Sequence, residues 1–290
     1  MQYKKMADKK IICTACAHYC QISNGEFGIC KTRQNQNGKL KSLVYGKVVA
    51  LNIDPIEKKP LFHFLPKTKT LSFGTLGCNF RCSWCQNWQI SQESKKAKIK
   101  NIDFSWGEKI SPQDIVRLAE KKSVPSISYT YNEPAIFIEY AYNTAKLARS
   151  HGIKNILVSN GFWSKETFNY IKPYTDAANI DLKSFEEKFY SKYCGASLKP
   201  VLETITKLNK QGIHLELTTL IIPTLNDSEK NLKNIADFIV ELNANIPWHI
   251  SRFFPCYKLS DLFPTPISTL KKAQKIGLSA GLKNVYIGNV

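Results

Sequence analysis

The sequence predicts an α/β fold in which six βα units form a partial barrel over residues 66–290, behind a small cysteine-rich, metal-binding lead-in over residues 1–65. From residue 70 onward, short β-branched runs alternate with helical patterns, which is typical of a parallel sheet. The first 65 residues lack this alternation and contain a cysteine cluster and turn-like glycines. A chain of 290 residues with 43% hydrophobic content can fill a core of this size.

Six runs are the predicted strands: 71–76 (LSFGTL), 126–131 (SISYTY), 154–159 (KNILVS), 177–182 (AANIDL), 214–222 (HLELTTLII) and 248–254 (WHISRFF). A barrel of parallel strands carries its chemistry at the C-terminal ends of the strands. The loops that follow these runs are therefore the expected functional loops.

Three helix starts can be predicted from capping residues. Ser111 begins a capping-box pattern with Pro112 at the first helical position, Pro134 opens a second helix, and Asp227 or Ser228 caps a third. The apolar faces expected for these helices are Ile115, Leu118 and Ala119; Ile136, Tyr140, Thr144 and Leu147; and Leu232, Ile235, Ile239 and Leu242.

The sequence predicts a cytoplasmic protein with no membrane partner. No run approaches the roughly 20 apolar residues that cross a bilayer, and the start, MQYKKMADKK, has neither a long apolar region nor a cleavage site. In that reducing compartment, nine cysteines indicate metal binding rather than disulfides. Seven of them are clustered, and only Cys194 and Cys256 stand alone.

The formal net charge is +18, from 41 basic and 23 acidic residues. Such a charge favours an anionic substrate, a nucleic acid or an acidic protein partner. The lysines are scattered along the chain, as in a lysine-biased proteome, and lack the interleaved aromatic and basic residues of a dedicated nucleic-acid surface. Nucleic-acid binding is therefore open but not favoured.

The segment CNFRCSWCQNW, residues 78–88, follows the first predicted strand and supplies three cysteines, Cys78, Cys82 and Cys85. A closed structural metal site uses four protein ligands, whereas an active site keeps one position open. The triplet therefore fits a [4Fe–4S] cluster whose fourth iron is free for a small molecule. The alternatives are a zinc site completed by a distant histidine, or chance spacing.

The C-x3-C-x2-C spacing, with Trp84 before the last cysteine, resembles the signature of the radical S-adenosylmethionine (SAM) superfamily over roughly residues 70–290. The resemblance implies a TIM-type partial barrel and SAM bound to the unique iron through its amino and carboxylate groups. One-electron reduction would then cleave the sulfonium, and the 5′-deoxyadenosyl radical would abstract a hydrogen from substrate. Because the chain is basic, an acidic flavodoxin or ferredoxin is the expected electron donor.

The resemblance also assigns cofactor-binding residues in other loops. In YTYNEP, Asn132 and Glu133 stand where many members carry Gly-Gly-Glu and would take the SAM amino group, although Glu133 could instead only start a helix. In VSNGFW, Ser159 and Asn160 are expected to bond the SAM carboxylate or ribose.

Charged residues near the ends of two later strands complete the predicted site. Asp181 and Lys183 follow the fourth strand, where function competes with a simple solvated strand end. His249 and Arg252 are three residues apart on the sixth strand, so they need not face the same way, and each could be satisfied elsewhere in the structure.

A narrower resemblance rests on CSWCQN, TYNEP, VSNG and IDLKSF, which are similar to the group around pyruvate formate-lyase activating enzyme. Segments such as CTACAHYCQISNGEFGICKTRQN and WHISRFFPCYK are closer still to the radical SAM member of the AmmeMemoRadiSam system. This implies a protein substrate or a Memo-type partner, but no firm substrate. Two departures are a cysteine-rich tail expected beyond Val290, either truncated or lacking, and Val158 where activating enzymes carry an acidic residue.

A second cysteine group, Cys13, Cys16, Cys20 and Cys30, offers four soft ligands, with His18 as a fifth candidate. Zinc and an auxiliary Fe–S cluster both fit four thiolates, and the spacing does not choose between them. Zinc would stabilise a segment too short to bury its own core, and a second cluster could pass electrons to the first. Unligated, reduced thiols are the remaining alternative.

The leading hypothesis is thus a radical SAM oxidoreductase acting on a protein or other macromolecule. A radical SAM tRNA-modifying enzyme, suggested by the charge, and a non-catalytic binding module stabilised by zinc or Fe–S are the alternatives. The sequence has no phosphate-cradling GxxxxGK[ST], no dinucleotide fingerprint and no supported Ser/His/Asp arrangement.

Overall fold

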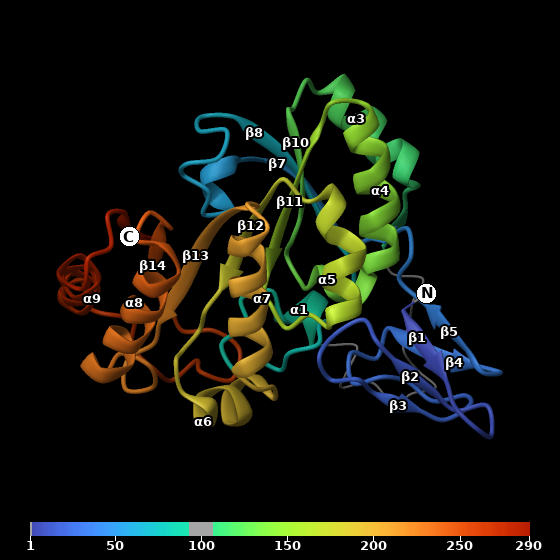
Figure 1. Cartoon of the computed structure of the whole chain (residues 1–290), viewed down its shortest axis with the longest axis horizontal. Helices are drawn as coiled ribbons and strands as arrows, with labels where there is room; N and C mark the ends of the chain where they lie inside the picture. The colour runs from blue at the N-terminus through green and yellow to red at the C-terminus, as the bar shows by residue number, and fades with distance from the viewer. Residues whose placement is uncertain (1, 93–106) are drawn as a thin grey trace.

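The computed structural model describes residues 2–92 and 107–290, and one eight-stranded sheet organises them. Its strands are β7 (Ala50–Pro55), β8 (Lys69–Gly74), β10 (Ser126–Tyr129), β11 (Lys154–Ser159), β12 (Ala177–Asp181), β13 (His214–Ile221), β14 (Trp248–Arg252) and β15 (Val285–Gly288). Strands β8 and β10 to β15 follow one another in parallel, and β7 pairs antiparallel with β8. Since β7 and β15 are the two edges of the sheet, it forms an open, partial barrel (Figure 1).

Helices connect the parallel strands and cover the outside of the sheet (Figure 1). They are α1 (Trp88–Ser91), α3 (Pro112–Lys121), α4 (Ile138–Ser150), α5 (Lys165–Ile171), α6 (Glu187–Phe189), α7 (Lys199–Lys210), α8 (Glu229–Asn243) and α9 (Ile267–Ala280). All six predicted strands are present in the predicted order, so the six βα units are confirmed. The sequence patterns missed β15, which has only four residues, and β7, whose polar Asn52 and Asp54 hide any apolar alternation.

The three predicted helix starts are confirmed, and the structure identifies Ser228, and not Asp227, as the cap of the third helix. Ser111 and Asp114 form the capping box of α3, and Pro134 opens a 3₁₀ turn (Pro134–Phe137) that leads into α4. Ser228 caps α8, because its side chain accepts a hydrogen bond from the backbone N–H of Asn231. Asp227 instead accepts from the N–H of Thr224 in the preceding turn. The predicted apolar faces are buried or half-buried against the sheet.

The inner face of the barrel is closed at the N-terminal ends of the strands. Residues 56–65 cross this end, where Ile56 and Leu61 are fully buried against Ile156 and Ala177. The backbone N–H groups of residues 62 and 63 donate to the buried Glu216 carboxylate on β13. The barrel therefore has a closed floor, and its functional loops lie at the opposite end.

The lead-in consists of short strands that pack at the loop end of the barrel. These are β1 (Tyr3–Lys5), β2 (Ile11–Cys13), β3 (Gln21–Ile22), β4 (Arg33–Gln36), β5 (Lys39–Ser42) and β6 (Lys47–Val48), the last paired with β9 (Glu108–Lys109). The Ala17 N–H donates to the Phe162 carbonyl, and the Thr167 hydroxyl donates to the Ala15 carbonyl. Because β7 lies within residues 1–65 yet belongs to the large sheet, the division at residue 65 stays a prediction.

A buried ion pair fastens the lead-in to the barrel. Arg33, whose side chain is 1% exposed, pairs with Glu139 on α4 and donates through Nε to the Ile136 carbonyl. Burial lowers the pKa of Arg33, but the Glu139 carboxylate outweighs it and holds that pKa above its usual value. Among the helices of the described residues, none is long and apolar enough to span a membrane.

Candidate functional site

A cavity of about 650 Å³ lies at the loop end of the barrel, within the size range of small-molecule sites. Nine of the predicted site residues line it: Cys78, Cys82, Trp84, Cys85, Asn132, Ser159, Asn160, Asp181 and Lys183. These residues come from the loops after four neighbouring strands. The structure therefore brings together most of what the sequence predicts.

The cysteine loop, residues 75–87, is held from behind by a π-helical turn, Tyr190–Cys194. The Arg81 N–H donates to the Cys194 carbonyl at 2.7 Å, and the Ser83 N–H donates to the Tyr193 carbonyl at 3.1 Å. The Asn132 side chain donates to the carbonyls of Thr75 and Gly77 at 2.7 and 2.8 Å. Asn132 therefore lines the cavity while it positions the loop.

The three thiols sit in different local contacts. Cys78 Sγ accepts from the Phe80 N–H, and Cys85 Sγ lies 3.0 Å from the Ser91 hydroxyl. A hydrogen bond with Cys194 and burial both raise the pKa of Cys82, and burial raises that of Cys85. A bound metal cation would reverse these shifts, because a coordinated thiol is deprotonated.

The donor chemistry of the triplet fits an iron–sulfur cluster. In the described part of the chain, no three Cys, His, Asp or Glu side chains converge as they would around one metal ion. In a [4Fe–4S] cluster, however, each thiolate binds a separate iron, so the thiols stand further apart than around a single ion. All three cysteines lie on one loop and line one cavity, and they do not converge around a single ion, which is compatible with such a cluster.

Asp181 and Lys183 form an ion pair at the cavity wall, with Lys183 Nζ 2.8 Å from Asp181 Oδ2. Burial lowers the pKa of Lys183, but Asp181 and then the Cys82 and Cys194 thiols act the other way, so the net pKa is raised. Lys183 therefore stays charged beside the cysteine loop, in an ion pair with Asp181.

Glu133 does not lie among the cavity-lining residues. Its oxygens accept hydrogen bonds from the Ala135 and Asn160 N–H groups, the Ser159 hydroxyl and the Trp163 indole. Burial raises the pKa of Glu133 despite these donors. With its acceptor positions occupied, Glu133 joins the β10 and β11 loops and starts the 3₁₀ turn, so the structure favours the structural interpretation over contact with SAM.

Ser159 and Asn160 reach the cavity, but each is also engaged with protein. Ser159 donates to Glu133, and Asn160 Nδ2 donates to Asn79 Oδ1 at 2.8 Å, next to Cys78. Asn160 therefore supports the cysteine loop from the side.

The structure places His249 and Arg252 away from the cavity and from each other. His249 Nε2 donates to Glu216 Oε2 at 2.6 Å near the barrel floor. Arg252 donates through Nε to the Thr265 carbonyl and lies against the Phe254 ring. Both side chains hydrogen-bond to other protein groups, as in the alternative to cofactor binding that the sequence left open.

Sequence patterns missed two sets of cavity neighbours. Cys194, which stands alone in the sequence, contacts Cys82 through the turn that backs the cysteine loop. Asn52, Asp54, Lys58, Lys59 and Tyr131 line the cavity from β7, the segment after it and the β10 loop. The only sequence signal was the Lys58–Lys59 pair, which resembled the other scattered lysine pairs.

The N-terminal cysteines lie next to the cysteine loop. His18 Nε2 donates to the Asn79 carbonyl at 2.9 Å, and Cys30 and Thr32 contact Gly77. Burial raises the pKa of Cys13 to about 11, and burial followed by the charges of the other three thiols raises that of Cys16. These four soft donors influence one another electrostatically, but among the described residues they do not converge as they would around a single ion. Zinc and an Fe–S cluster both stay predictions for this group.

Gly77 marks the contact between the two cysteine regions and yields a stability prediction. Its φ is +87°, and an added Cβ would lie 2.4 Å from Thr32 Cγ2 and 3.1 Å from the Cys30 carbonyl oxygen. Gly77→Ala should therefore destabilise the protein by about 2–5 kcal/mol, from left-handed strain plus overpacking. Urea denaturation measures this loss.

Gly212→Ala is the matched control, because Gly212 also has a positive φ (+67°) but nothing within 4 Å of an added Cβ. The Gly212→Ala variant should lose only the stability that comes from left-handed backbone strain, about 1–2 kcal/mol. Equal losses in the two variants would mean that the contact between Gly77 and the lead-in is not tight.

Comparisons with known proteins agree with this geometry. The model of the radical SAM superfamily matches residues 73–239, more than half of the chain. An uncharacterized protein of Methanocaldococcus jannaschii is 46% identical over 291 residues, covering 100% of this chain and 84% of that protein. The pyruvate formate-lyase-activating enzyme of Clostridium pasteurianum is 21% identical over 216 residues, covering 69% of this chain and 86% of that protein.

A solved structure shows the same fold. Streptococcus suis SuiB bound to S-adenosylmethionine superposes with a TM-score of 0.55 at 14% identity, over 76% of this chain and 51% of that one. The match of the superfamily model over residues 73–239 shows the family, and the cysteine triplet at the mouth of the partial barrel agrees with it. The chain belongs to the radical SAM superfamily.

Proposed function

We propose that this protein cleaves SAM reductively and uses the resulting radical to abstract hydrogen from a substrate bound in the cavity. Membership of the superfamily implies a [4Fe–4S] cluster and SAM as cofactors. The observation that carries the proposal is the placement of Cys78, Cys82 and Cys85 on one loop facing the cavity. When the cluster is bound, it supplies one electron to SAM, which gives methionine and a 5′-deoxyadenosyl radical; hydrogen abstraction then gives 5′-deoxyadenosine and a substrate radical.

The chain's own residues would hold and shield these groups. The three cysteines would bind the cluster, and Asn132 and Asn160 would fix the loop that carries them. Ser159, Asp181 and Lys183 line the space beside the loop and can bond polar groups of SAM. Trp84, 4% exposed and packed on Phe189, shields the loop from water.

The substrate and partners are part of the proposal. The relative from Clostridium pasteurianum is an activating enzyme of pyruvate formate-lyase, which supports a protein substrate and a separate reductant such as a flavodoxin or ferredoxin. A basic surface favours an acidic electron donor. The AmmeMemoRadiSam assignment and a Memo-type partner stay predictions.

A tRNA substrate is the second candidate, and its one support is the net charge of +18. Binding of tRNA that weakens steeply between 50 and 200 mM salt would support it. The absence of tRNA binding at 50 mM salt would rule out a tRNA substrate.

We also propose a metal at Cys13, Cys16, Cys20 and Cys30, either zinc or a second Fe–S cluster. Its support is the electrostatic coupling of four buried or half-buried thiols. Analysis for zinc, iron and labile sulfide separates these alternatives, and it also tests a purely zinc-stabilised binding module, which would contain no iron.

The cluster assignment can be tested by spectroscopy. After anaerobic reconstitution with iron and sulfide and reduction with dithionite, we expect an electron paramagnetic resonance signal that changes when SAM is added. A reduced cluster whose signal is insensitive to SAM would contradict a free iron position facing the cavity.

A further inference from the structure

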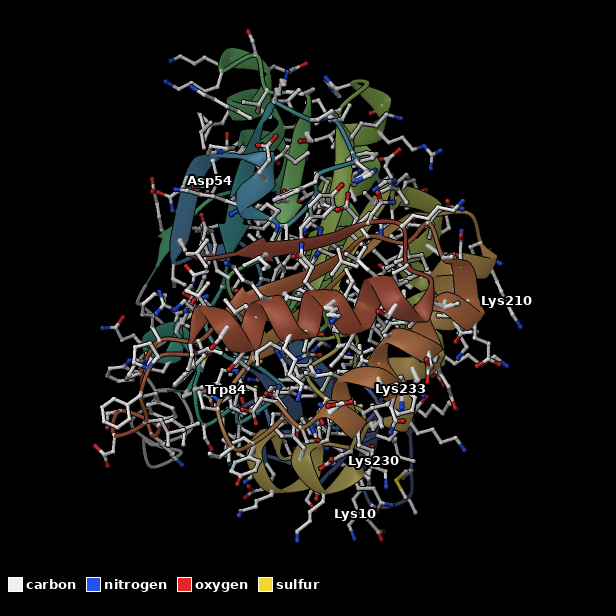
Figure 2. All side chains as sticks on the ribbon, turned by 90° about the vertical axis from the view of Figure 1, so that its left-hand side faces the viewer. Lys10, Asp54, Trp84, Lys210, Lys230 and Lys233 are labelled. Atoms are coloured by element: carbon white, nitrogen blue, oxygen red, sulfur yellow. The ribbon has the colours of Figure 1, made fainter. Side chains whose placement is uncertain are left out.

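One side of the cavity has a polar wall to which the proposed function assigns no role. It meets the cysteine loop where Asn87 Nδ2 donates to the Tyr131 carbonyl, and it extends from there to Asp54. It consists of Asn52, Asp54, Lys58, Lys59 and Tyr131, hereafter the lysine wall. Asp54 pairs with Thr70 on β8, four residues before Gly74, which is about 13 Å along the strand at ~3.3 Å per residue. Figure 2 shows Asp54 on the blue strand in the upper part of the molecule and Trp84, from the cysteine loop, well below it.

In the lysine wall, the Asp54 carboxylate pairs with two ammonium groups. Asp54 Oδ2 accepts from Lys59 Nζ at 2.7 Å and from the Tyr131 hydroxyl at 2.9 Å, and Lys58 Nζ lies 3.7 Å from Asp54 Oδ1. Lys59 Nζ also lies 4.7 Å from the centroid of the Tyr131 ring. Two lysines against one aspartate leave one uncompensated positive charge in this wall.

The remaining charged residues that line the cavity do not offset this charge. Among the described residues these are Asp181 and Lys183, which pair with each other at 2.8 Å. The uncompensated charge therefore belongs to the lysine wall. At the buried Lys59, water screens the attraction for an anion less than it does at the exposed Lys58.

The two lysines differ in exposure, which tells how a ligand would reach them. The Lys59 side chain is 5% exposed, whereas the Lys58 side chain is 69% exposed. A buried ammonium is costly unless it is fully paired, and among the described residues Lys59 has one carboxylate partner, Asp54, which it shares with Lys58. An anion in the cavity would give the Lys59 ammonium a second negatively charged partner. The exposed Lys58 would attract that anion first.

We propose that the lysine wall binds the carboxylate or phosphate group of a small organic anion, and that this anion is the substrate. Anchored there, its carbon skeleton would extend toward the cysteine loop, where SAM would lie. The inference rests on the proposed function and narrows its substrate to a small anion in place of a protein. A small molecule fits because Lys59 is reached from within the cavity.

The test uses the oxidised, reconstituted holoenzyme and inorganic phosphate as the probe, with binding measured by titration calorimetry. Lys59→Met should weaken phosphate binding at least about tenfold, the loss of one charge-assisted contact. Lys58→Met should weaken it less, and it keeps the test valid if the buried variant fails to fold. Lys233→Met is the matched control, since Figure 2 shows Lys233 far from Asp54, and it should bind like the native protein.

The same samples are assayed for 5′-deoxyadenosine, which should form at the native rate in Lys233→Met, the variant outside the cavity. Binding that is undetectable in the native protein, or equally weak in Lys233→Met, would overturn the lysine wall as an anion site. Displacement of phosphate by an acidic peptide but not by small carboxylates such as succinate would overturn the small-molecule assignment. Loss of 5′-deoxyadenosine in the native protein would instead count against the proposed function alone.

Discussion

Replacing Cys82 with alanine is expected to abolish 5′-deoxyadenosine formation, down to the level of a sample without enzyme. Cys82 lies at the centre of the cysteine loop and is 8% exposed beside the cavity. Two remaining thiols cannot supply the three ligands that leave one iron open. Mass spectrometry of product after reduction with dithionite measures the loss, and iron and sulfide analysis should show a smaller cluster content.

Cys256→Ala provides the matched control. The Cys256 thiol donates to the Cys85 carbonyl at 3.6 Å, and Cys256 is not among the described residues that line the cavity. This variant should retain most of the product. Full activity in Cys82→Ala would show that the cysteine triplet does not hold the reactive cluster.

We expect the free energy of unfolding to decrease at acid pH because of Glu216, which lies in the barrel floor. Glu216 is fully buried and accepts hydrogen bonds from His214, His249 and two backbone N–H groups. Burial alone would raise the pKa of Glu216, but these donors outweigh it and lower the pKa from 4.5 to about 2. The unfolded chain therefore takes up a proton at higher pH than the folded protein does.

The sign of the effect follows from that difference. Stabilisation by ionised Glu216 is fully present above about pH 4.5 and is lost as the pH falls toward 2. Its size is about 3 kcal/mol, from a shift of roughly 2.5 pKa units. Urea denaturation of the native protein and of Glu216→Gln should show a gap at pH 7 that narrows as the pH falls from about 4.5.

An exposed carboxylate serves as the control for Glu216. Glu229, 70% exposed and paired with Lys272, should give a Glu229→Gln variant within about 0.5 kcal/mol of the native protein at every pH. A gap between Glu216→Gln and the native protein that stays constant with pH would contradict the depressed pKa.

The cysteine loop could be predicted from sequence because its ligands are local. Three cysteines within eight residues share one loop, and the preceding strand fixes the end of the barrel at which that loop lies. Glu133 shows the opposite case. Whether its carboxylate faces SAM or protein depends on Ser159, Asn160 and Trp163, which lie on another loop.

The lysine wall escaped prediction for a related reason. Asp54, Lys59 and Tyr131 meet only because β7 pairs antiparallel with β8, which brings them to the inner face of the barrel. A pairing between distant segments has no signature in a single sequence, and the polar β7 gave no alternation to detect. Short β15 was missed because four residues carry too little pattern.

The contact between the lead-in and the cysteine loop links the two cysteine groups physically. His18 bonds the Asn79 carbonyl, and Arg33 anchors the same lead-in to α4 through Glu139. A metal at the N-terminal cysteines would therefore stabilise the segment that supports the cysteine loop. Electron transfer from a second cluster would also have a short path through this contact.

The most direct test of radical SAM chemistry is the yield of 5′-deoxyadenosine from the native protein. The protein is reconstituted anaerobically with iron and sulfide, reduced with dithionite and incubated with SAM, and the product is identified by mass spectrometry. We expect 5′-deoxyadenosine that depends on both reductant and protein. A fully formed cluster that yields no 5′-deoxyadenosine would contradict the proposed function.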